Sequence, residues 1–285
     1  MRRARKLRWL AVAAVLAVAA GFALHRAFRP TPMERTEIFR GVYLTVEELP
    51  RSAHGSGRVM IVEVHWDAPG VRLAGRPYSF SHDPADPAAP HYRLEYADRG
   101  LARHGAAVLM NTTRYEPHEF WRSLPGMPVR SHESLVVDGK VSHVHAHSYL
   151  LYWDAAGEAR LLTRKPPDAE SLDEALLGTG MQGISVSEGR PRHQAFGDRH
   201  LLDSRTFIGV DPQRRILWML AFERASGYLM AERAVEEGVV FGGMLDSGDG
   251  TQLLVGRQAL GVRAHTGIRH WRPLGAYLMV FADPL

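Results

Sequence analysis

The chain has 285 residues and a formal net charge of +4, with 45% hydrophobic and 23% charged residues. This composition excludes an intrinsically disordered chain, and the absence of cysteine excludes disulfides, thiolate metal sites and a cysteine nucleophile. Five basic residues lie within the first eight positions, so the rest of the chain is close to neutral. We therefore expect no nucleic-acid partner, because such a partner requires a basic patch on the folded domain.

An apolar run, Trp9–Leu24, directly follows the N-terminal basic cluster. As a helix it would extend roughly 24 Å, slightly less than the ~30 Å hydrocarbon core of a bilayer. The pattern predicts a signal anchor or a cleaved signal peptide over residues 1–24, and a buried helix is a third interpretation. The first two export the remaining chain. We therefore expect an extracytoplasmic protein, held in the inner membrane by residues 9–24 and facing the periplasm, or secreted.

Residues 25–40 contain Pro30 and Pro32 among charged residues and are predicted to be a linker to a domain over residues 41–285. Within that domain, short runs rich in β-branched and aromatic residues dominate. The predicted strands are Arg58–Trp66, Ala106–Met110, Ser134–Val137, Ser148–Trp153, Gly183–Ser187, Thr206–Val210, Arg215–Phe222, Val239–Leu245 and Ala276–Phe281.

The best helix candidate is Tyr228–Glu237, which places Leu229, Ala234 and Val235 on one face and ends before Gly238. Two polar segments, Ser81–Pro90 and Lys165–Glu174, are predicted to be surface loops. The expected fold class is therefore α+β: a strand-rich single domain with few helices, preceded by one N-terminal hydrophobic helix. The sequence does not indicate an oligomeric state.

Residues 205–255 combine a strand hairpin, a helix and a strand that ends in the acidic turn DSGDG. This stretch resembles the phosphodiester glycosidase family, in which an Arg-Thr pair opens the hairpin and an Asp-Gly-Gly-Gly-Ser turn ends the last strand. Arg205 and Thr206 match the pair, whereas Asp246 and Gly248 match two turn positions. Upstream, Asn111 in AAVLMNTTRYEP matches the asparagine of the family's Asn-Gly-Gly motif. The resemblance extends from about residue 58 to residue 282.

The same stretches differ from the family pattern. Thr112 and Thr113 replace the two glycines after the asparagine, Ser247 and Asp249 replace turn glycines, and Gly250 stands where serine is expected. Because glycine permits close approach of a ligand, these replacements reshape the pocket. Two expectations follow from the resemblance. One is hydrolysis of a sugar C1–O–phosphate bond in envelope or exported glycans, and the alternative is a non-catalytic envelope domain that binds sugar phosphates or polysaccharide.

Such hydrolysis requires a carboxylate near the anomeric carbon, a cation for the phosphate and polar groups that orient the sugar. The resemblance implies Asp246 as the carboxylate, Arg205 as the phosphate contact and Asn111 as an orienting residue. The expected substrate-binding residues are Thr206, Arg114, Gly248, Asp249 and Thr251. No cofactor is required, although Asp246 and Asp249 together also suggest a divalent cation site as a further hypothesis.

Three histidines, His143, His145 and His147, alternate in the segment HVHAH. On a strand all three side chains would face one side, which is a spacing that can chelate zinc. The alternatives are an incidental stripe or one that faces carbohydrate.

Overall fold

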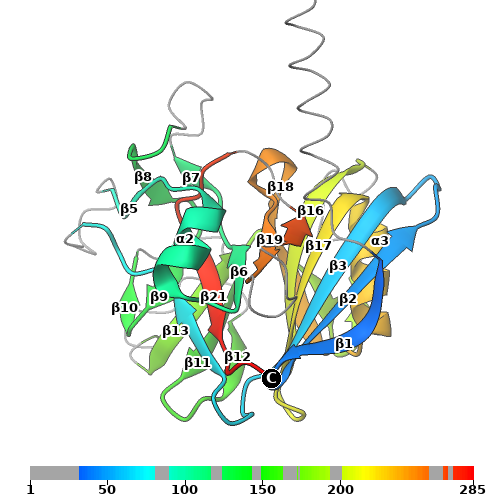
Figure 1. Ribbon diagram of the computed structural model, residues 1–285, viewed down its shortest axis with the longest axis horizontal. Coiled ribbons are helices and arrows are strands. Elements are labelled where there is room, and N and C mark those ends of the chain that lie inside the picture. Colours follow the sequence, from blue (N-terminus) through cyan, green and yellow to red (C-terminus); the bar gives the residue numbers. More distant parts are fainter. Residues whose placement is uncertain are drawn as a thin grey trace, which may run out of the picture.

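The computed structural model describes residues 32–80, 90–116, 124–142, 149–162, 172, 174–192, 201–256, 266–268 and 272–285. They form a strand-rich domain with two short α-helices (Figure 1). The predicted N-terminal helix, the stripe His143–His147 and most of both predicted loops lie outside these ranges. In the described part of the chain, no helix is long and apolar enough to cross a membrane.

The largest sheet has eight strands in the order β1-β2-β3-β17-β16-β18-β14-β15, with antiparallel neighbours (Figure 1, right). Its strands are β1 (Met33–Phe39), β2 (Val42–Leu49), β3 (Gly55–His65), β14 (Gly183–Ser187), β15 (Arg190–Pro191), β16 (Asp203–Asp211), β17 (Ile216–Ala225) and β18 (Phe241–Ser247).

Strand β1 corrects the expected boundary between linker and domain. The prolines and charges of residues 25–40 predict a linker, but Met33–Phe39 pairs with β2 along the sheet edge. Ile38 and Phe39 are 3% and 2% exposed, so the strand is anchored by apolar burial. The domain therefore includes residue 33 and does not begin at residue 41.

Three smaller sheets complete the described structure. Two have five strands, in the orders β10-β9-β13-β11-β12 and β20-β19-β6-β21-β4, and one has the order β5-β8-β7. Their strands are β4 (Arg72–Gly75), β5 (Tyr92–Arg93), β6 (Val108–Asn111), β7 (Tyr115–Glu116), β8 (Pro128–Ser131), β9 (Leu135–Val137), β10 (Lys140–Val141), β11 (Tyr149–Asp154), β12 (Ala159–Leu162), β13 (Ala175–Met181), β19 (Leu253–Val255), β20 (Thr266–Ile268) and β21 (Tyr277–Phe281).

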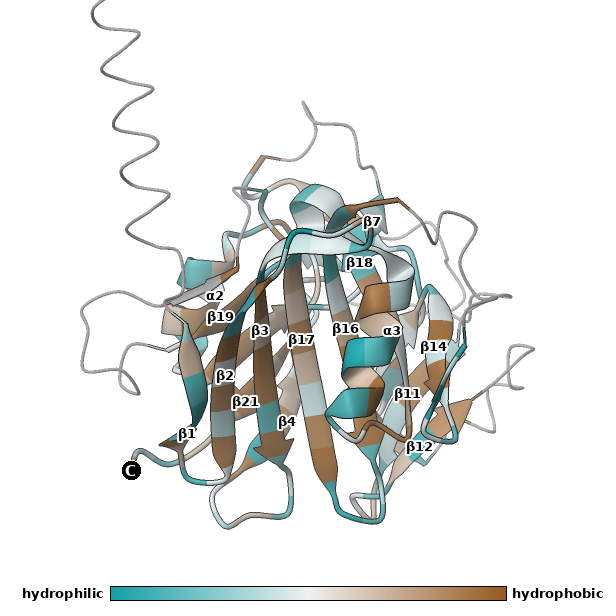
Figure 2. Cartoon of the chain, turned by 90° about the vertical axis from the view of Figure 1, so that its right-hand side faces the viewer, coloured by the Kyte–Doolittle hydropathy of each residue, from teal (hydrophilic) through white to brown (hydrophobic). Residues whose placement is uncertain are grey.

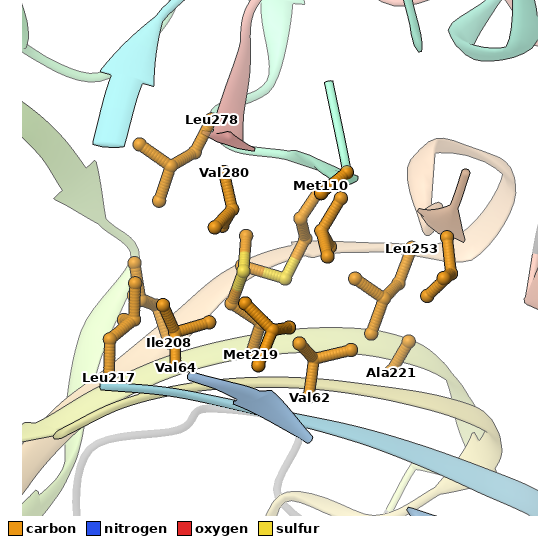
Figure 3. Close-up of a cluster of buried hydrophobic side chains, with 14 of the residues drawn as sticks. Val62, Val64, Met110, Ile208, Leu217, Met219, Ala221, Leu253, Leu278 and Val280 are labelled. Atoms are coloured by element: carbon orange, nitrogen blue, oxygen red, sulfur yellow. The ribbon is translucent and has the colours of Figure 1, made fainter. Parts of the chain in front are cut away.

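The main core lies between the eight-stranded sheet and the sheet that contains β6, β19 and β21 (Figure 3). Val62 and Met219 from the large sheet point toward Met110, Leu253 and Leu278 from the opposite sheet. Each fully buried side chain of this kind contributes about 1.5–3 kcal/mol. This packing fixes the positions at which β6, β18 and β19 end.

The two helices lie on opposite parts of the domain. Helix α3 (Gly227–Glu236) covers the outer face of the large sheet (Figure 2), and α2 (Ala97–His104) packs near β6. The side chain of Ser226 caps α3 by accepting the N–H of Leu229, and Gly238, at φ +97°, follows its end. The predicted helix is confirmed within one residue at each end. Its buried face is formed by Met230, Ala231 and Ala234, whereas Leu229 and Val235 are half-buried.

Candidate active site

Asp246 lies near the end of β18, where the chain enters the short 3-10 helix η4 (Gly248–Gly250) and then continues into β19. The pairing between β16 and β18 is irregular here, because Arg205 pairs with Ser247 but Phe207 pairs with Met244. Strand β18 therefore contains one extra residue in this interval. Such bulges interrupt the regular alternation of side chains and are frequent beside active sites.

The carboxyl group of Asp246 is buried, with 8% of the residue exposed. Its Oδ1 accepts the N–H of Ser247 at 2.8 Å, and Oδ2 lies so close to Gly250 that a Cβ there would approach it to 2.1 Å. The glycine thus provides the space for the carboxyl group. The pKa of Asp246 is raised to about 7, mainly by burial. Among the smaller contributions, the N–H of Ser247 lowers this pKa, the charge of Glu133 raises it, and the charges of Arg272 and Arg114 lower it.

Two neighbouring residues of β16 have different relations to Asp246. Thr206 is fully buried, and its hydroxyl is 3.3 Å from both the backbone O and the backbone N of Asp246. Arg205 points to the opposite face of the strand. Its Nε donates to Ala225 O and its Nη2 to Leu201 O, each at 2.9 Å, and its Nη1 lies 2.9 Å from the sulfur of Met244. The structure brings Thr206 to Asp246 but directs the Arg205 guanidinium toward protein acceptors.

Asn111 at the end of β6 is joined to the turn after η4. Its Oδ1 accepts the N–H of Gln252 at 2.9 Å, and its own N–H donates to Gln252 O at 3.0 Å. The Nδ2 of Asn111 and the hydroxyls of Thr112 and Thr251 are buried and have no hydrogen-bond partner among the residues that the structure describes. Buried polar atoms are almost always hydrogen-bonded in proteins, so three such atoms in adjoining segments indicate a place where a ligand could supply the partners.

A partly buried ion pair joins the loop after β6 to the connection between β8 and β9. Glu133 is 3% exposed, and its Oε1 accepts hydrogen bonds from Nε and Nη2 of Arg114 at 3.2 and 3.1 Å. The backbone N–H of Arg114 donates to Oε2 at 3.1 Å. Gly180 of β13 permits this approach, since a Cβ there would lie 2.6 Å from Glu133 Cβ. Arg114 itself is half exposed and reaches solvent.

A second cation, Arg272, lies just before β21. Its Nε donates to the hydroxyl of Tyr115 at 2.6 Å, and its guanidinium carbon lies 4.7 Å from the centre of the Tyr115 ring. Its Nη1 forms an ion pair with Asp249 Oδ1 at 2.7 Å. Gly248, at φ +67°, adopts the left-handed conformation that turns the chain between Asp246 and Asp249.

The divalent cation suggested for Asp246 and Asp249 remains a hypothesis. Asp249 forms its ion pair with Arg272, and within the described ranges no three histidine, aspartate or glutamate side chains are arranged to hold a metal ion.

Sequence reasoning did not identify Glu133 or Arg272 as members of this site. Glu133 directly precedes a predicted strand, and Arg272 precedes another, but neither has a recognisable motif. Their charges act on Asp246 because loops distant in sequence converge at the end of β18. The predicted residues Asn111, Arg114, Asp246, Gly248, Asp249 and Thr251 lie in the segments that form this site.

Comparisons with known proteins agree with this architecture. No protein-family model matches the sequence, and no curated protein sequence matches it. Among solved structures, the catalytic domain of zebrafish N-acetylglucosamine-1-phosphodiester alpha-N-acetylglucosaminidase, auto-inhibited by its pro-peptide, has a TM-score of 0.57 at 13% identity; the match covers 90% of this chain and 87% of that one. The chain therefore has a phosphodiester glycosidase-like fold.

Two further structures share this fold. A hypothetical protein from Synechocystis has a TM-score of 0.59 at 12% identity. The match covers 89% of this chain but only 64% of the length of the Synechocystis protein. A putative exported protein from Burkholderia pseudomallei has a TM-score of 0.55 at 11% identity, over 86% of this chain and 76% of that one.

Proposed function

We propose that this protein hydrolyses a glycosyl phosphodiester by cleaving the bond between sugar C1 and the phosphate oxygen. The observation that carries the proposal is Asp246, a buried carboxyl group with a pKa of about 7 within electrostatic range of Arg114 and Arg272. The adjoining segments carry buried polar atoms that have no partner among the described residues. The fold shared with the zebrafish glycosidase domain supports the same chemistry.

In this reaction a water molecule attacks C1, the C1–O bond breaks, and the phosphate monoester leaves with the electron pair. Asp246 in its ionised form accepts the proton from the attacking water. A general base is most effective when its pKa lies near the working pH, and a pKa of about 7 meets that condition at neutral pH. The phosphate monoester is a good leaving group, so the reaction has less need of a strong general acid.

The cations proposed for the phosphate are Arg114 and Arg272, whose charges both act on Asp246. They replace Arg205 in this role because Arg205 is only 5% exposed and its nitrogens contact Ala225, Leu201 and Met244, whereas the Arg114 side chain is 50% exposed. We assign Arg205 instead to holding β16 in place, and with it Thr206.

The sugar is oriented in this proposal by the unpartnered side-chain atoms of Asn111, Thr112 and Thr251. Sugar hydroxyls can both donate and accept hydrogen bonds, so they match amide and hydroxyl groups without charge. The partner is thus a carbohydrate or sugar phosphate. We further propose an extracytoplasmic location, in line with the shared fold of the putative exported protein from Burkholderia pseudomallei, with residues 9–24 as the membrane segment.

The test is sugar release from an N-acetylglucosamine-phosphoryl-mannoside-type diester by the full 285-residue chain. Asp246→Asn keeps the size of the side chain and removes the base, so the rate should fall roughly 10²–10⁴-fold. Asp211→Asn is the matched control. Asp211 is also 8% exposed, but its Oδ1 accepts the N–H groups of Gln213 and Arg214 in the β16–β17 turn. This variant should retain activity.

The second candidate function is sugar-phosphate binding without catalysis. It is favoured by Thr112 and Thr113, each 3% exposed, which occupy positions of glycine in the family motif. Binding of the diester by the folded wild-type chain without sugar release would support this candidate. Release by Asp246→Asn at the wild-type rate would instead remove Asp246 from the reaction.

A further inference from the structure

We propose that Asp249 is an internal competitor for Arg272, occupying its guanidinium until the phosphate group of a ligand displaces the carboxylate. The proposal rests on the proposed function for the chemistry of the ligand, a phosphate monoester or diester. It assigns Arg272 as the displaceable phosphate contact and makes Asp249 a residue that sets the affinity for phosphate.

Arg272 is held in position by contacts that do not involve Asp249. Its Nε donates to the Tyr115 hydroxyl, its guanidinium lies over the Tyr115 ring, and that hydroxyl donates to Pro273 O at 3.1 Å. The backbone O of Arg272 accepts a hydrogen bond from Gln252 Nε2 at 2.6 Å. The guanidinium would therefore keep its place when Asp249 moves away.

Asp249 is the more exposed member of the pair. Its side chain is 58% exposed, compared with 19% for Arg272, and the contact is between Nη1 and Oδ1. Exposed ion pairs are weak because solvent screens them and ordering the side chains costs entropy. A phosphate group carries several acceptor oxygens that match the planar donors of arginine, so it can replace a single carboxylate oxygen.

The pair also adjoins the unpartnered polar atoms. Gln252 connects the two groups, because its backbone N–H donates to Asn111 Oδ1 and its side chain donates to the backbone of Arg272. Thr251 directly precedes it, with a buried hydroxyl that has no partner in the described part of the chain. A sugar phosphate that contacts Arg272 would thus lie beside uncharged groups able to bind its hydroxyls.

The test is titration of the full chain with inorganic phosphate, followed by ³¹P NMR or calorimetry. Asp249→Ala removes the competitor and should tighten phosphate binding by about two- to fivefold. Arg272→Met should weaken binding by roughly tenfold or more, since it removes a charge-assisted contact. In the Arg272→Met background, Asp249→Ala should have no further effect, because the two residues act through one another.

Glu158→Ala is the matched control for loss of one negative charge. Glu158 is 40% exposed and pairs with Arg215, a residue of the β16–β17 turn, so its loss should leave phosphate affinity unchanged. Equal tightening by Glu158→Ala, or tightening by Asp249→Ala without Arg272, would reduce the effect to net charge and overturn the proposal.

Unchanged or weaker phosphate binding by folded Asp249→Ala would also overturn the proposal. So would the absence of phosphate binding in both the wild-type chain and this variant. In those cases sugar release from the diester would still support the proposed hydrolase. Conversely, tighter phosphate binding by Asp249→Ala without any hydrolysis would retain this inference and favour the binding function.

Discussion

Two buried aspartates at opposite ends of the domain show how local donors decide the role of a carboxyl group. Asp154 ends β11 at the turn into β12, and Asp246 lies near the end of β18 (Figure 1). They are 6% and 8% exposed. Asp154 accepts the N–H groups of Ala156 and Glu158 and a hydrogen bond from Arg160 Nε at 2.7 Å, whereas Asp246 accepts the N–H of Ser247.

The two pKa values move in opposite directions for this reason. Burial raises the pKa of both carboxyl groups, but at Asp154 the hydrogen bonds from Glu158, Arg160 and Ala156 outweigh burial and lower it. At Asp246 burial prevails and raises the pKa to about 7. A carboxylate with a full set of donors stabilises the fold. One with few donors costs stability when ionised and retains a proton affinity suited to chemistry.

The largest expected effect on stability is that Asp246→Asn and Asp154→Asn change the free energy of unfolding in opposite directions. At pH 8, Asp246→Asn should raise the free energy of unfolding by up to about 4 kcal/mol. The substitution removes the cost of ionising a buried carboxyl group whose pKa is raised from 3.8 to about 7, at ~1.4 kcal/mol for each pH unit. Asp154→Asn should lower it by about 1–3 kcal/mol, because a charge-assisted contact is lost. Urea denaturation measures both, and a loss of stability in both variants would contradict the comparison.

The same comparison predicts the pH dependence of stability. Asp246 binds its proton more tightly in the folded state than at its ordinary pKa of 3.8. Its contribution to stability therefore falls as the pH rises from about 4 to about 7. Asp154 has the opposite sign, because its stabilisation is present above 3.8 and is lost at lower pH. Between pH 4 and pH 8, the melting temperature of Asp246→Asn should fall less than that of the wild type. Parallel curves for the two proteins would exclude a raised pKa of Asp246 in the folded state.

Arg205 extends the comparison to a buried cation that has protein acceptors. Arg205→Met should lower the free energy of unfolding by about 2 kcal/mol, since the carbonyls of Ala225 and Leu201 lose a charged donor. Arg215→Met, at an exposed ion pair, should change stability by less than about 1 kcal/mol. If Arg205→Met instead left stability intact and weakened phosphate binding, Arg205 would be the phosphate contact.

The smallest expected effect concerns the electrostatic environment of Asp246. Glu133→Gln removes a nearby negative charge, so the pKa of Asp246 should fall. The acid limb of the pH–rate profile for sugar release should consequently move to lower pH. A shift toward higher pH would show that Glu133 acts mainly by pairing with Arg114 and not through its own charge.

Much of the strand pattern could be predicted from sequence because it depends on local chemistry. Runs such as Arg215–Phe222 and Gly183–Ser187 are mostly apolar or β-branched and are bounded by turn residues. The second coincides with β14, and all of the first except the turn residue Arg215 lies on β17. Other elements have weaker local signals. Strand β13 contains Gly178 and Gly180, which are required by the close approach of Tyr152 and Glu133 and do not by themselves indicate a strand.

Sequence alone determined the strand-rich character of the domain and, within one residue, the limits of α3, and it indicated Asp246 as a candidate site residue. These features depend on patterns within short segments: runs of apolar and β-branched residues, the turn residues between them, and the acidic turn that contains Asp246. Only the tertiary structure placed Glu133 and Arg272 within electrostatic range of Asp246 and turned Arg205 toward protein carbonyls. The reason is physical: burial and charge at a site are set by loops that converge from distant parts of the chain, and no local pattern contains that information.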